Sequence, residues 1–405
     1  MKIKLPQNNS SGVTNTRDKS FPISYGMKVL SIGTDRKLFE GGSAVLLRSL
    51  DIACKMEELH IIVFSLRKHD LSSKKIKNLY IYPTNSNSRT GYISDALKIA
   101  KNVVLNSDFL RGQSVISTQD PFETGLVGYR LKKRFNLPLQ IQIHTDFLSP
   151  YFKNSFLNRI RVILAKFLIP KADGLRVVSS FIGDSIKKLS PALKTQPDIL
   201  PVFIDIENIL KDNSEYVIDF PQFDFTVLMA SRLTKEKRID VALDAIKKVT
   251  KQFPKSGLII YGNGPEKNNL EVKVSSLGLT KNVVFIGWRE DLVSLYKTFD
   301  IFLLTSEYEG YGMTLIEAGA SGCPIVTTDV GLAKTDLFKD GQNSFVCPVG
   351  DVDCLSKKII LLLSDKSKRQ LFKQRMQDSI KSMALSKEEY TANYIGLLEK
   401  LLKNV

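Results

Sequence analysis

Long apolar segments are missing from this chain of 405 residues. No run of about 18 or more apolar residues occurs, so we expect no membrane-spanning helix. Residues 1–22 are polar and lack the apolar core of a signal peptide, and we therefore expect a poorly ordered extension there and a cytoplasmic location. The hydrophobic content of 43% is otherwise that of an ordinary soluble globular protein.

Cysteine is scarce as well, with only Cys54, Cys323, Cys347 and Cys354 in the whole chain. Their spacing matches neither a zinc site nor a disulfide framework, so we expect reduced and mostly buried thiols. Internal repeats, low-complexity tracts and the motifs of RNA- or DNA-binding domains are also missing, and the basic stretches carry no interleaved aromatic residues. These absences argue against a nucleic-acid-binding protein.

Negative charge is in short supply in the first half of the chain. Residues 1–205 contain 31 Lys and Arg against 16 Asp and Glu, a balance of +15, whereas residues 206–405 contain 27 against 26, a balance of +1. This asymmetry predicts an acidic partner for the first half, which could be an anionic membrane, a pyrophosphate lipid or nucleic acid. The alternative is a basic face that interacts only with solvent.

Short apolar runs alternate with amphipathic helical stretches, a pattern typical of parallel βαβ units. The length fits two domains of about 200 residues each, so we expect an α/β protein with two Rossmann-like, doubly wound domains. The expected divisions are a first domain over 23–205, a linker over 206–223, a second domain over 224–389 and a last helix over 390–405. The expected strands are 27–32, 60–66, 114–118, 139–144 and 175–179 in the first domain, and 225–230, 258–261, 283–286, 301–304 and 325–328 in the second.

Two glutamates, Glu309 and Glu317, flank a glycine-containing loop that follows the predicted strand 301–304. Residues 313–321 favour a helix, so the loop leads into a helix N-terminus. Free backbone N–H groups there attract phosphate, and the two loop glycines let the backbone approach it closely. Carboxylates accept hydrogen bonds from the vicinal hydroxyls of sugars. This arrangement therefore suits a sugar nucleotide.

Each of these glutamates also has a structural explanation. A carboxylate in a first helical turn is favoured by the helix dipole, and a Gly-rich turn before a helix is common in α/β proteins. Their combination with further motifs at predicted strand ends favours a functional site. These motifs are Gly41-Gly42, Gln142-Ile-His144-Thr-Asp146, Ser231-Arg-Leu-Thr-Lys-Glu-Lys237 and Tyr261-Gly-Asn-Gly264-Pro265.

On these motifs the chain resembles the retaining glycosyltransferases of family four, which have the GT-B architecture of two Rossmann-like domains facing across a cleft. The Glu-x7-Glu signature of that family is intact as Glu309 and Glu317, and residues 318–331 look like its usual continuation. Arg238 stands where the family often has glycine. The resemblance also implies that the last helix, 390–405, crosses back to the first domain.

The resemblance implies a donor site in the second domain. Arg232 and Lys237 would bind the diphosphate, whose negative charge grows as the glycosidic bond breaks, although Lys237 could also belong to a solvated turn. Glu317 would accept hydrogen bonds from the ribose hydroxyls, and Glu309 would face the transferred sugar. Backbone N–H groups for the phosphates would come from Gly310, Tyr311, Gly312 and Met313, and the nucleotide end of the site would include Gly264 and Arg289.

The first domain is expected to complete this site. The resemblance implies that His144 contacts the donor sugar near the reacting carbon, whereas a lone histidine is more often structural. Gly41 and Gly42 could bring backbone amides close to the donor phosphates or the acceptor. Asp120 and Asp146 are expected on the acceptor side.

Neither a metal ion nor a redox cofactor is expected. Asp351 and Asp353 resemble the metal-binding pair of another glycosyltransferase fold, but they precede a helical stretch, where Asp353 is better explained as an N-cap. Gly262 and Gly264 lack the third glycine of a dinucleotide fingerprint, so they give NAD binding little support. The expected small molecule is a nucleotide-diphosphate sugar as co-substrate, of either UDP or GDP type.

Residues 151–169 combine a broad apolar surface with Lys153, Arg159, Arg161 and Lys166. This composition predicts a basic amphipathic helix that lies on a membrane surface. The alternative is an ordinary packed helix whose cations extend to solvent.

The resulting hypothesis is a retaining glycosyltransferase that moves a sugar from a nucleotide-diphosphate sugar to a hydroxyl of a lipid-linked saccharide in polysaccharide assembly, cytoplasmic and peripheral on the inner face of the plasma membrane. One alternative is a soluble or protein acceptor. A GT-B-shaped sugar-nucleotide epimerase would need no acceptor sugar, a phosphorylase would need inorganic phosphate, and a nucleic-acid-binding protein would bind RNA in a salt-sensitive way without binding a sugar nucleotide.

Overall fold

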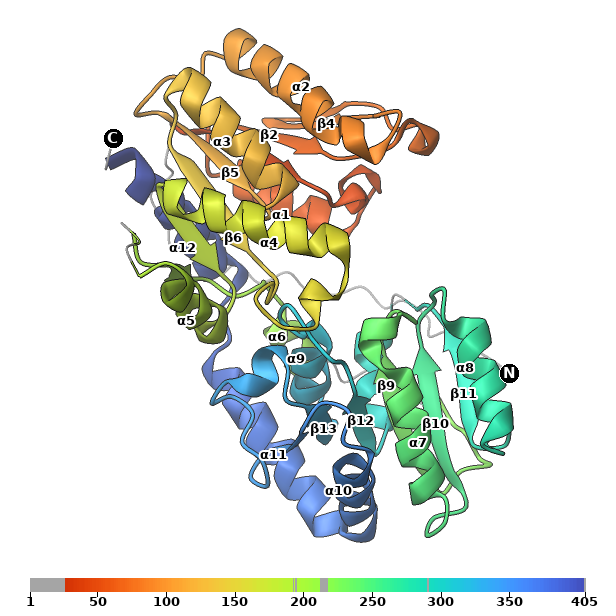
Figure 1. The fold of residues 1–405 in the computed structure, drawn as a ribbon. Helices are drawn as coiled ribbons and strands as arrows, with labels where there is room; N and C mark the ends of the chain where they lie inside the picture. Colours follow the sequence, from red (N-terminus) through yellow and green to blue (C-terminus); the bar gives the residue numbers. More distant parts are fainter. Residues whose placement is uncertain (1–25, 192, 194, 212–217, 290, 404–405) are drawn as a thin grey trace, which may run out of the picture.

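The computed structural model describes residues 26–191, 193, 195–211, 218–289 and 291–403, which form two α/β domains (Figure 1). The extension expected over 1–22 lies outside the described residues. The first domain is built on an eight-stranded sheet of order β3-β4-β2-β1-β5-β6-β7-β8, and the second on a six-stranded sheet of order β11-β10-β9-β12-β13-β14. The prediction of two doubly wound parallel-sheet domains is confirmed.

The strands of the first sheet are parallel except at one edge, where β3 runs antiparallel to β4. Its inner strands β5, β6 and β7 are buried at every residue, because helices cover both faces of a parallel sheet. The strands are β1 (Lys28–Gly33), β2 (Glu58–Val63), β3 (Lys74–Ile76), β4 (Leu79–Pro83), β5 (Ser114–Thr118), β6 (Leu139–Ile143), β7 (Gly174–Val177) and β8 (Asp198–Ile199). The helices are α1 (Ala44–Ala53), α2 (Tyr92–Asn106), α3 (Glu123–Phe135), α4 (Phe156–Leu168) and α5 (Ser180–Leu189).

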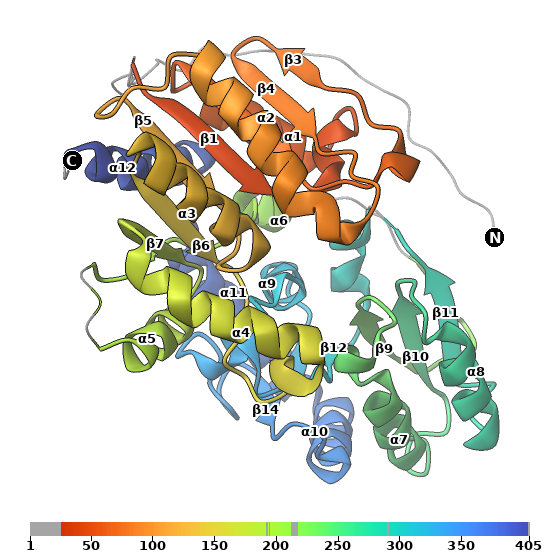
Figure 2. The same ribbon diagram turned by 45° about the horizontal axis from the view of Figure 1, so that its top comes forward.

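The second sheet is parallel throughout, and helices cover its two faces (Figure 2). Its strands are β9 (Phe225–Ala230), β10 (Ser256–Tyr261), β11 (Val283–Gly287), β12 (Ile301–Leu304), β13 (Ile325–Thr328) and β14 (Phe345–Cys347). The helices of this half are α6 (Ile206–Lys211), α7 (Ile239–Val249), α8 (Lys267–Ser276), α9 (Met313–Ala320), α10 (Val352–Ser364) and α11 (Lys366–Ser382). Because β9 and β12 are neighbours, the loops at their carboxyl ends lie side by side.

The last helix, α12 (Lys387–Lys403), packs against β5 and β6 of the first sheet (Figure 1). Leu398 and Leu401 on its inner face are 0% and 3% exposed. Gly174 at the start of β7 lies against Leu401, and a Cβ added to this glycine would lie 2.7 Å from the leucine side chain. Helix α12 therefore follows the second domain in sequence but packs on the first.

Within the segment expected to be a linker, the structure has the short helix α6, which contacts α9 and α11. Four strands have no counterpart among the predicted ones, namely β3, β4, β8 and β14. Strands β3, β8 and β14 have only two or three residues each, which is too short for an apolar pattern to distinguish them from loops. Strand β4 has five residues and was missed.

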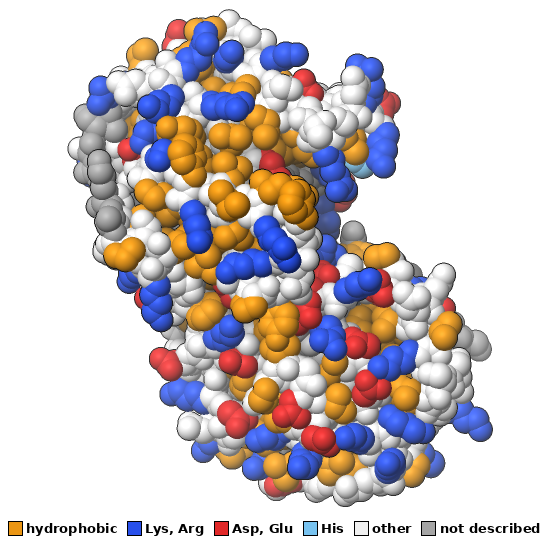
Figure 3. Space-filling view, viewed as in Figure 1, with side chains coloured by type: hydrophobic (Ala, Val, Ile, Leu, Met, Phe, Trp, Pro, Cys, Tyr) orange, Lys and Arg blue, Asp and Glu red, His pale blue; other side chains and the backbone are white. Residues whose placement is uncertain are grey.

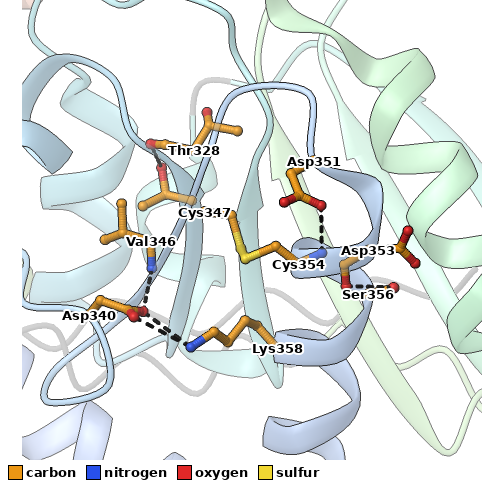
Figure 4. The surroundings of a disulfide bond; sticks show 10 residues. Thr328, Asp340, Val346, Cys347, Asp351, Asp353, Cys354, Ser356 and Lys358 are labelled. Carbon is orange, nitrogen blue, oxygen red and sulfur yellow. Dashed lines mark hydrogen bonds and ion pairs between the residues drawn. A yellow bond between two sulfur atoms is a disulfide. The ribbon is translucent and has the colours of Figure 1, made fainter.

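The expectation of four reduced thiols is wrong. Cys347, the last residue of β14, forms a disulfide with Cys354 in the first turn of α10 (Figure 4). Cys54 is exposed, and of the four only Cys323 is both free and buried. The pairing was missed because a seven-residue separation does not by itself indicate a bridge, whereas the turn from β14 into α10 brings the two Cα atoms within 5.8 Å.

The N-cap of α10 also differs from the prediction. Asp351 caps this helix, because its carboxylate accepts a hydrogen bond from the backbone N–H of Cys354 at 2.9 Å (Figure 4). Asp353 lies inside the first turn and accepts a hydrogen bond from Lys248 Nζ at 2.6 Å. Both carboxylates therefore have structural partners.

Candidate active site

The loop after β12 ends at a helix whose N-terminus no side chain caps. Gly312 is the N-cap of α9 with φ 95°, a left-handed conformation that favours glycine. As glycine it offers no side-chain acceptor to the first backbone N–H groups of α9. These groups can therefore bind a phosphate, which the helix dipole also favours. Met313 at this end of the helix is 41% exposed, whereas Tyr311 is buried.

Hydrogen bonds join this loop to the loop after β9. The Thr305 hydroxyl donates to the backbone carbonyls of Lys237 and Arg238 at 3.0 and 2.9 Å. In addition, the Glu307 N–H donates to the Glu236 carbonyl at 2.9 Å. These bonds hold the two sequence motifs of the second domain together.

The result is an ion pair between Lys237 and Glu309. Lys237 Nζ lies 2.6 Å from Glu309 Oε1, and the two side chains are only 14% and 13% exposed. The Ser306 hydroxyl donates to the same carboxylate oxygen at 2.7 Å. Lys237 is therefore fixed at the carboxyl edge of the sheet. One carboxylate oxygen of Glu309 accepts hydrogen bonds from both Lys237 and Ser306.

Two arginines of the loop after β9 differ in how their charges are paired. Arg232 is 72% exposed and reaches only Glu236, at 3.4 Å, so its guanidinium can turn toward a ligand at low cost. Arg238 has φ 46°, which explains why glycine is common at this position in the family. Its guanidinium pairs with Asp240 at 3.1 Å and with Glu307 at 3.7 Å, so the additional charge is neutralised locally.

Glu317 lies on α9 and accepts a hydrogen bond from the Tyr296 hydroxyl at 3.1 Å. Burial raises the pKa of Glu317, and the bond from Tyr296 opposes that rise. Tyr296 is fully buried, 21 residues away in sequence. The tyrosine thus orients the carboxylate that the resemblance assigns to the ribose.

The two domains meet at Gly310. A Cβ on this residue would lie 2.3 Å from the backbone carbonyl oxygen of His144, in the loop after β6. The Phe152 and Tyr308 rings form a second contact between the domains, with 6.2 Å between their centroids. The glycine loop of the second domain therefore lies directly against the histidine motif of the first.

His144 itself is held by the first domain. Its Nε2 lies 3.0 Å from Gln142 Oε1. Burial, together with the positive charges of Arg176 and Arg48, lowers the pKa of His144 to about 3. The imidazole is therefore neutral at physiological pH and can offer a hydrogen-bond acceptor to a sugar hydroxyl.

A further contact across the domains lies at the end of β11. Trp288 is 60% exposed, and Lys37 Nζ of the first domain lies 5.4 Å from the centroid of its ring. Lys37 precedes Gly41 and Gly42, where a Cβ would meet nothing within 4 Å. An exposed indole at the nucleotide end of a Rossmann-like domain can stack on a base. The predictions for this region did not single out either Trp288 or Lys37.

The other residues predicted for the nucleotide end have local partners. Arg289 pairs with Asp291 through two hydrogen bonds. Gly264 packs against the motif after β9, where a Cβ would lie 2.3 Å from the Leu233 carbonyl oxygen. Their roles in nucleotide binding stay predictions.

The acceptor-side residues Asp120 and Asp146 both follow strands of the first sheet. Asp146 is 8% exposed, and burial raises its pKa against the opposing charges of Lys334 and Lys153. The Asp120 carboxylate accepts hydrogen bonds from the backbone N–H groups of Phe122 and Thr124, at 2.7 and 3.3 Å. Asp120 therefore shapes the turn into α3, and an acceptor role for either residue stays a prediction.

The carboxyl of Asp120 should make the stability of the protein depend on pH. Burial raises the pKa of this carboxyl from 3.8 to about 6, so the folded state holds its proton more tightly than the unfolded chain. The wild-type free energy of unfolding should therefore fall as the pH rises from about 4 to 6, through this group's contribution. In Asp120→Asn, which keeps an oxygen for Phe122 N–H, that fall should be smaller. Urea unfolding at intervals of pH measures it, and identical slopes in both proteins would contradict the assignment.

Among the described residues, no group of three or more His, Cys, Asp or Glu side chains could hold a metal ion. Positive charge at the site comes instead from Lys237, Arg232 and the N-terminus of α9.

Solved structures with the same two-domain architecture support the class of this fold. Sucrose-phosphate synthase from Thermosynechococcus elongatus aligns with a TM-score of 0.77 at 18% identity, covering 94% of this chain and 100% of that one. Anabaena HepE, solved in complex with UDP, aligns with a TM-score of 0.70 at 19% identity, covering 92% and 100%. The chain has the GT-B fold.

Residues 211–379 match the family model of glycosyl transferases group 1. This match covers most of the second domain and agrees with the resemblance of its motifs.

Curated relatives resemble only part of the chain. The poly(glycerol-phosphate) alpha-glucosyltransferase of Bacillus subtilis is 27% identical over 46% of this chain and 28% of its own length. The GtfA subunit of the UDP-N-acetylglucosamine–peptide N-acetylglucosaminyltransferase of Streptococcus gordonii is 30% identical over 37% and 31%. The alpha-monoglucosyldiacylglycerol synthase of Streptococcus pneumoniae is 28% identical over 58% and 54%. The chain thus covers under a third of the first two relatives and about half of the third.

Proposed function

We propose that the protein is a retaining glycosyltransferase that moves a sugar from a nucleotide-diphosphate sugar to an acceptor hydroxyl. The observation that carries this proposal is the buried Lys237–Glu309 pair, which lies in the loops beside the uncapped N-terminus of α9. The contact of Gly310 with the His144 carbonyl brings the first domain to the same place. The site therefore combines cations and N–H groups for a diphosphate with a carboxylate for sugar hydroxyls.

The chemistry follows from these groups. As the bond between the anomeric carbon and the diphosphate breaks, the leaving phosphate gains charge, which Lys237, Arg232 and the N–H groups of α9 stabilise more than they stabilise the ground state. Glu309 already accepts hydrogen bonds at one oxygen, and its other oxygen can orient a hydroxyl of the sugar. No dedicated carboxylate nucleophile is evident, so we propose attack on the same face, with the leaving phosphate accepting the proton of the acceptor.

The donor is tested with UDP, GDP and ADP and with their sugars. A nucleotide that binds only the folded protein raises the unfolding temperature by mass action. One of the three series should do so, and its sugar form should support transfer. NMR of the product should show the anomeric configuration of the donor sugar, and an inverted anomer would overturn the retaining mechanism. Hydrolysis or isomerisation without any acceptor would favour an epimerase, and a requirement for inorganic phosphate would favour a phosphorylase.

For the acceptor, we propose a lipid-linked saccharide at an anionic membrane, in the assembly of a polysaccharide. The relatives act, by their names, on poly(glycerol phosphate), on a diacylglycerol lipid and on a peptide, so the choice for this chain rests on its own surface. No helix in the described part of the chain is long and apolar enough to cross a membrane. The proposed contact is therefore peripheral.

The surface that supports this choice is the outer face of α4. Figure 3 shows hydrophobic side chains gathered on the side of the first domain that carries α3 and α4, with Lys and Arg among them. On α4 the apolar side chains recur at intervals of three and four residues, which places them on one helical face. They are Phe156 (78% exposed), Ile160 (46%), Ile163 (68%) and Phe167 (49%).

The opposite face of α4 holds the helix on the domain through the buried residues Val162, Ala165 and Leu168. Between the two faces stand the exposed cations Arg159 and Lys166, and α4 carries no acidic residue. An apolar stripe bordered by cations suits the boundary between the headgroups and acyl chains of an anionic bilayer. Phe152, just before α4, contacts Tyr308 beside the site, so a bound membrane would lie near the entrance for a lipid-linked acceptor.

This surface predicts salt-sensitive binding to vesicles. The full-length protein should float with vesicles that contain anionic lipid and not with neutral ones, because each cation near the headgroups contributes about 1 kcal/mol. Changing Arg159 and Lys166 to Glu should abolish flotation, and so should Ile163→Glu. The matched control changes the exposed Lys251 and Lys281 of the second domain to Glu, with the same change in net charge and no expected loss. Equal flotation of all variants, or none by the wild type, would contradict the membrane assignment and leave a soluble or protein acceptor.

A further inference from the structure

A buried arginine of the first domain joins the last helix to the histidine motif. Arg176 on β7 is 4% exposed. Its guanidinium donates to the Leu200 and Pro201 carbonyls at 3.3 and 3.0 Å. It also donates to the Tyr390 hydroxyl of α12 at 2.8 Å and to Gln142 Oε1 at 2.8 Å. Buried arginines need such partners because an uncompensated charge is costly away from water.

The arginine fixes the orientation of the Gln142 amide. Arg176 has only donors, so the atom of Gln142 that faces it must be the carbonyl oxygen. The amide nitrogen then points to the Ser117 hydroxyl at 2.9 Å and to the Tyr394 hydroxyl of α12 at 3.3 Å. These partners therefore determine which side-chain atom of Gln142 is the oxygen and which is the nitrogen.

That assignment determines the tautomer of His144. The carbonyl oxygen of Gln142 can only accept a hydrogen bond, so His144 Nε2, which lies 3.0 Å from it, must carry the proton. In a neutral imidazole the other nitrogen, Nδ1, is then an acceptor. Among the described residues, no group forms a hydrogen bond with Nδ1.

We propose that Gln142, held by Arg176 and by Tyr394 from the last helix, is a positioning residue that fixes the Nε2–H tautomer of His144, so that Nδ1 accepts a hydrogen bond from a hydroxyl of the donor sugar. This inference rests on the proposed function, because it assigns a partner to His144 within the same site. It also gives α12, which packs on the first sheet, a role in transfer. The positive charge of Arg176 further disfavours protonation of the imidazole.

The tautomer can be measured directly and without any substrate. The chain contains only three histidines, so long-range ¹H–¹⁵N spectra of histidine-labelled protein resolve each ring, and His144→Asn identifies the signals of His144. The wild type should show a neutral His144 with the proton on Nε2. A proton on Nδ1, or a charged ring at neutral pH, would overturn the inference even if the protein proves to be an active glycosyltransferase.

Kinetics test the consequence for transfer. Gln142→Met removes the acceptor oxygen at similar volume, and kcat should fall about tenfold to a hundredfold, as when an orienting partner of a ligating histidine is lost. KM for the donor should change less. Gln142→Glu restores an acceptor for both Arg176 and His144 and should recover most of kcat. Tyr394→Phe, which removes only a hydroxyl, should lower kcat in the same direction by a smaller factor, while His144 should keep the Nε2–H tautomer because Arg176 still orients the amide.

Controls separate this inference from general damage and from the proposed function. His69→Gln, outside the network, should leave kcat unchanged, and thermal melts should show that the Gln142 and Tyr394 variants are folded. If Gln142→Met keeps both the wild-type kcat and the Nε2–H tautomer, the positioning role is wrong. If the wild type transfers no sugar from any nucleotide, the proposed function is wrong. The tautomer of His144 can still be measured in that case, because the experiment needs no substrate.

Discussion

Replacing Lys237 by Ala should lower kcat by about a hundredfold to a thousandfold, the loss typical of removing one preorganised group that stabilises developing charge. Lys237 is the most buried cation of the donor site, paired at 2.6 Å with Glu309. Its charge stabilises the leaving diphosphate more as the bond breaks, so the effect should fall mainly on kcat. Initial-rate kinetics with the donor identified by thermal shift would measure it.

Loss of Lys237 also leaves the Glu309 carboxylate without its cation, which can destabilise the fold. The double variant Lys237→Ala with Glu309→Gln removes both charges, and it should recover unfolding free energy without recovering kcat. The matched control is Lys235→Ala, an exposed lysine of the same turn, which should behave like the wild type. Wild-type kinetics in Lys237→Ala would remove the donor-site assignment.

Replacing Gly310 by Ala should separate transfer from nucleotide binding. The new Cβ would lie 2.3 Å from the His144 carbonyl oxygen, and a backbone carbonyl cannot move aside as a flexible side chain can. The two domains would have to shift apart, and a displacement of about 1 Å at a reacting centre can lower the rate by about a hundredfold. Nucleoside diphosphate binding, measured by calorimetry, should stay close to that of the wild type, because its groups lie within the second domain.

Gly396→Ala provides the control for this change. Gly396 is an exposed glycine of α12 with nothing within 4 Å of an added Cβ. This variant should retain wild-type transfer and gain about 1 kcal/mol of stability at most, from the better helix propensity of alanine. If Gly310→Ala also transfers at the wild-type rate, the approach of Gly310 to His144 is not part of the active arrangement.

Several strands and the motif at Glu309 could be predicted from the sequence because the residues that indicate them are close together in the chain. The strands at 114–118, 301–304 and 325–328 were predicted with the bounds that the structure gives. Each is a short run of mostly apolar or β-branched residues that is buried throughout, so the residue types themselves indicate a strand. The motif at Glu309 is equally local, since a strand, two glycines and a helix follow one another within a few residues.

The amino-acid sequence by itself thus determined the two-domain α/β class and the family resemblance of the second domain, because strand periodicity and contiguous motifs need no knowledge of distant contacts. Tertiary structure alone decided which side chains meet. Tyr296 reaches Glu317 across 21 residues, and Tyr394 reaches Gln142 across 252. The disulfide between Cys347 and Cys354 depends on the turn from β14 into α10. Such pairings arise when packed elements bring distant residues together, and spacing along the chain does not encode that geometry.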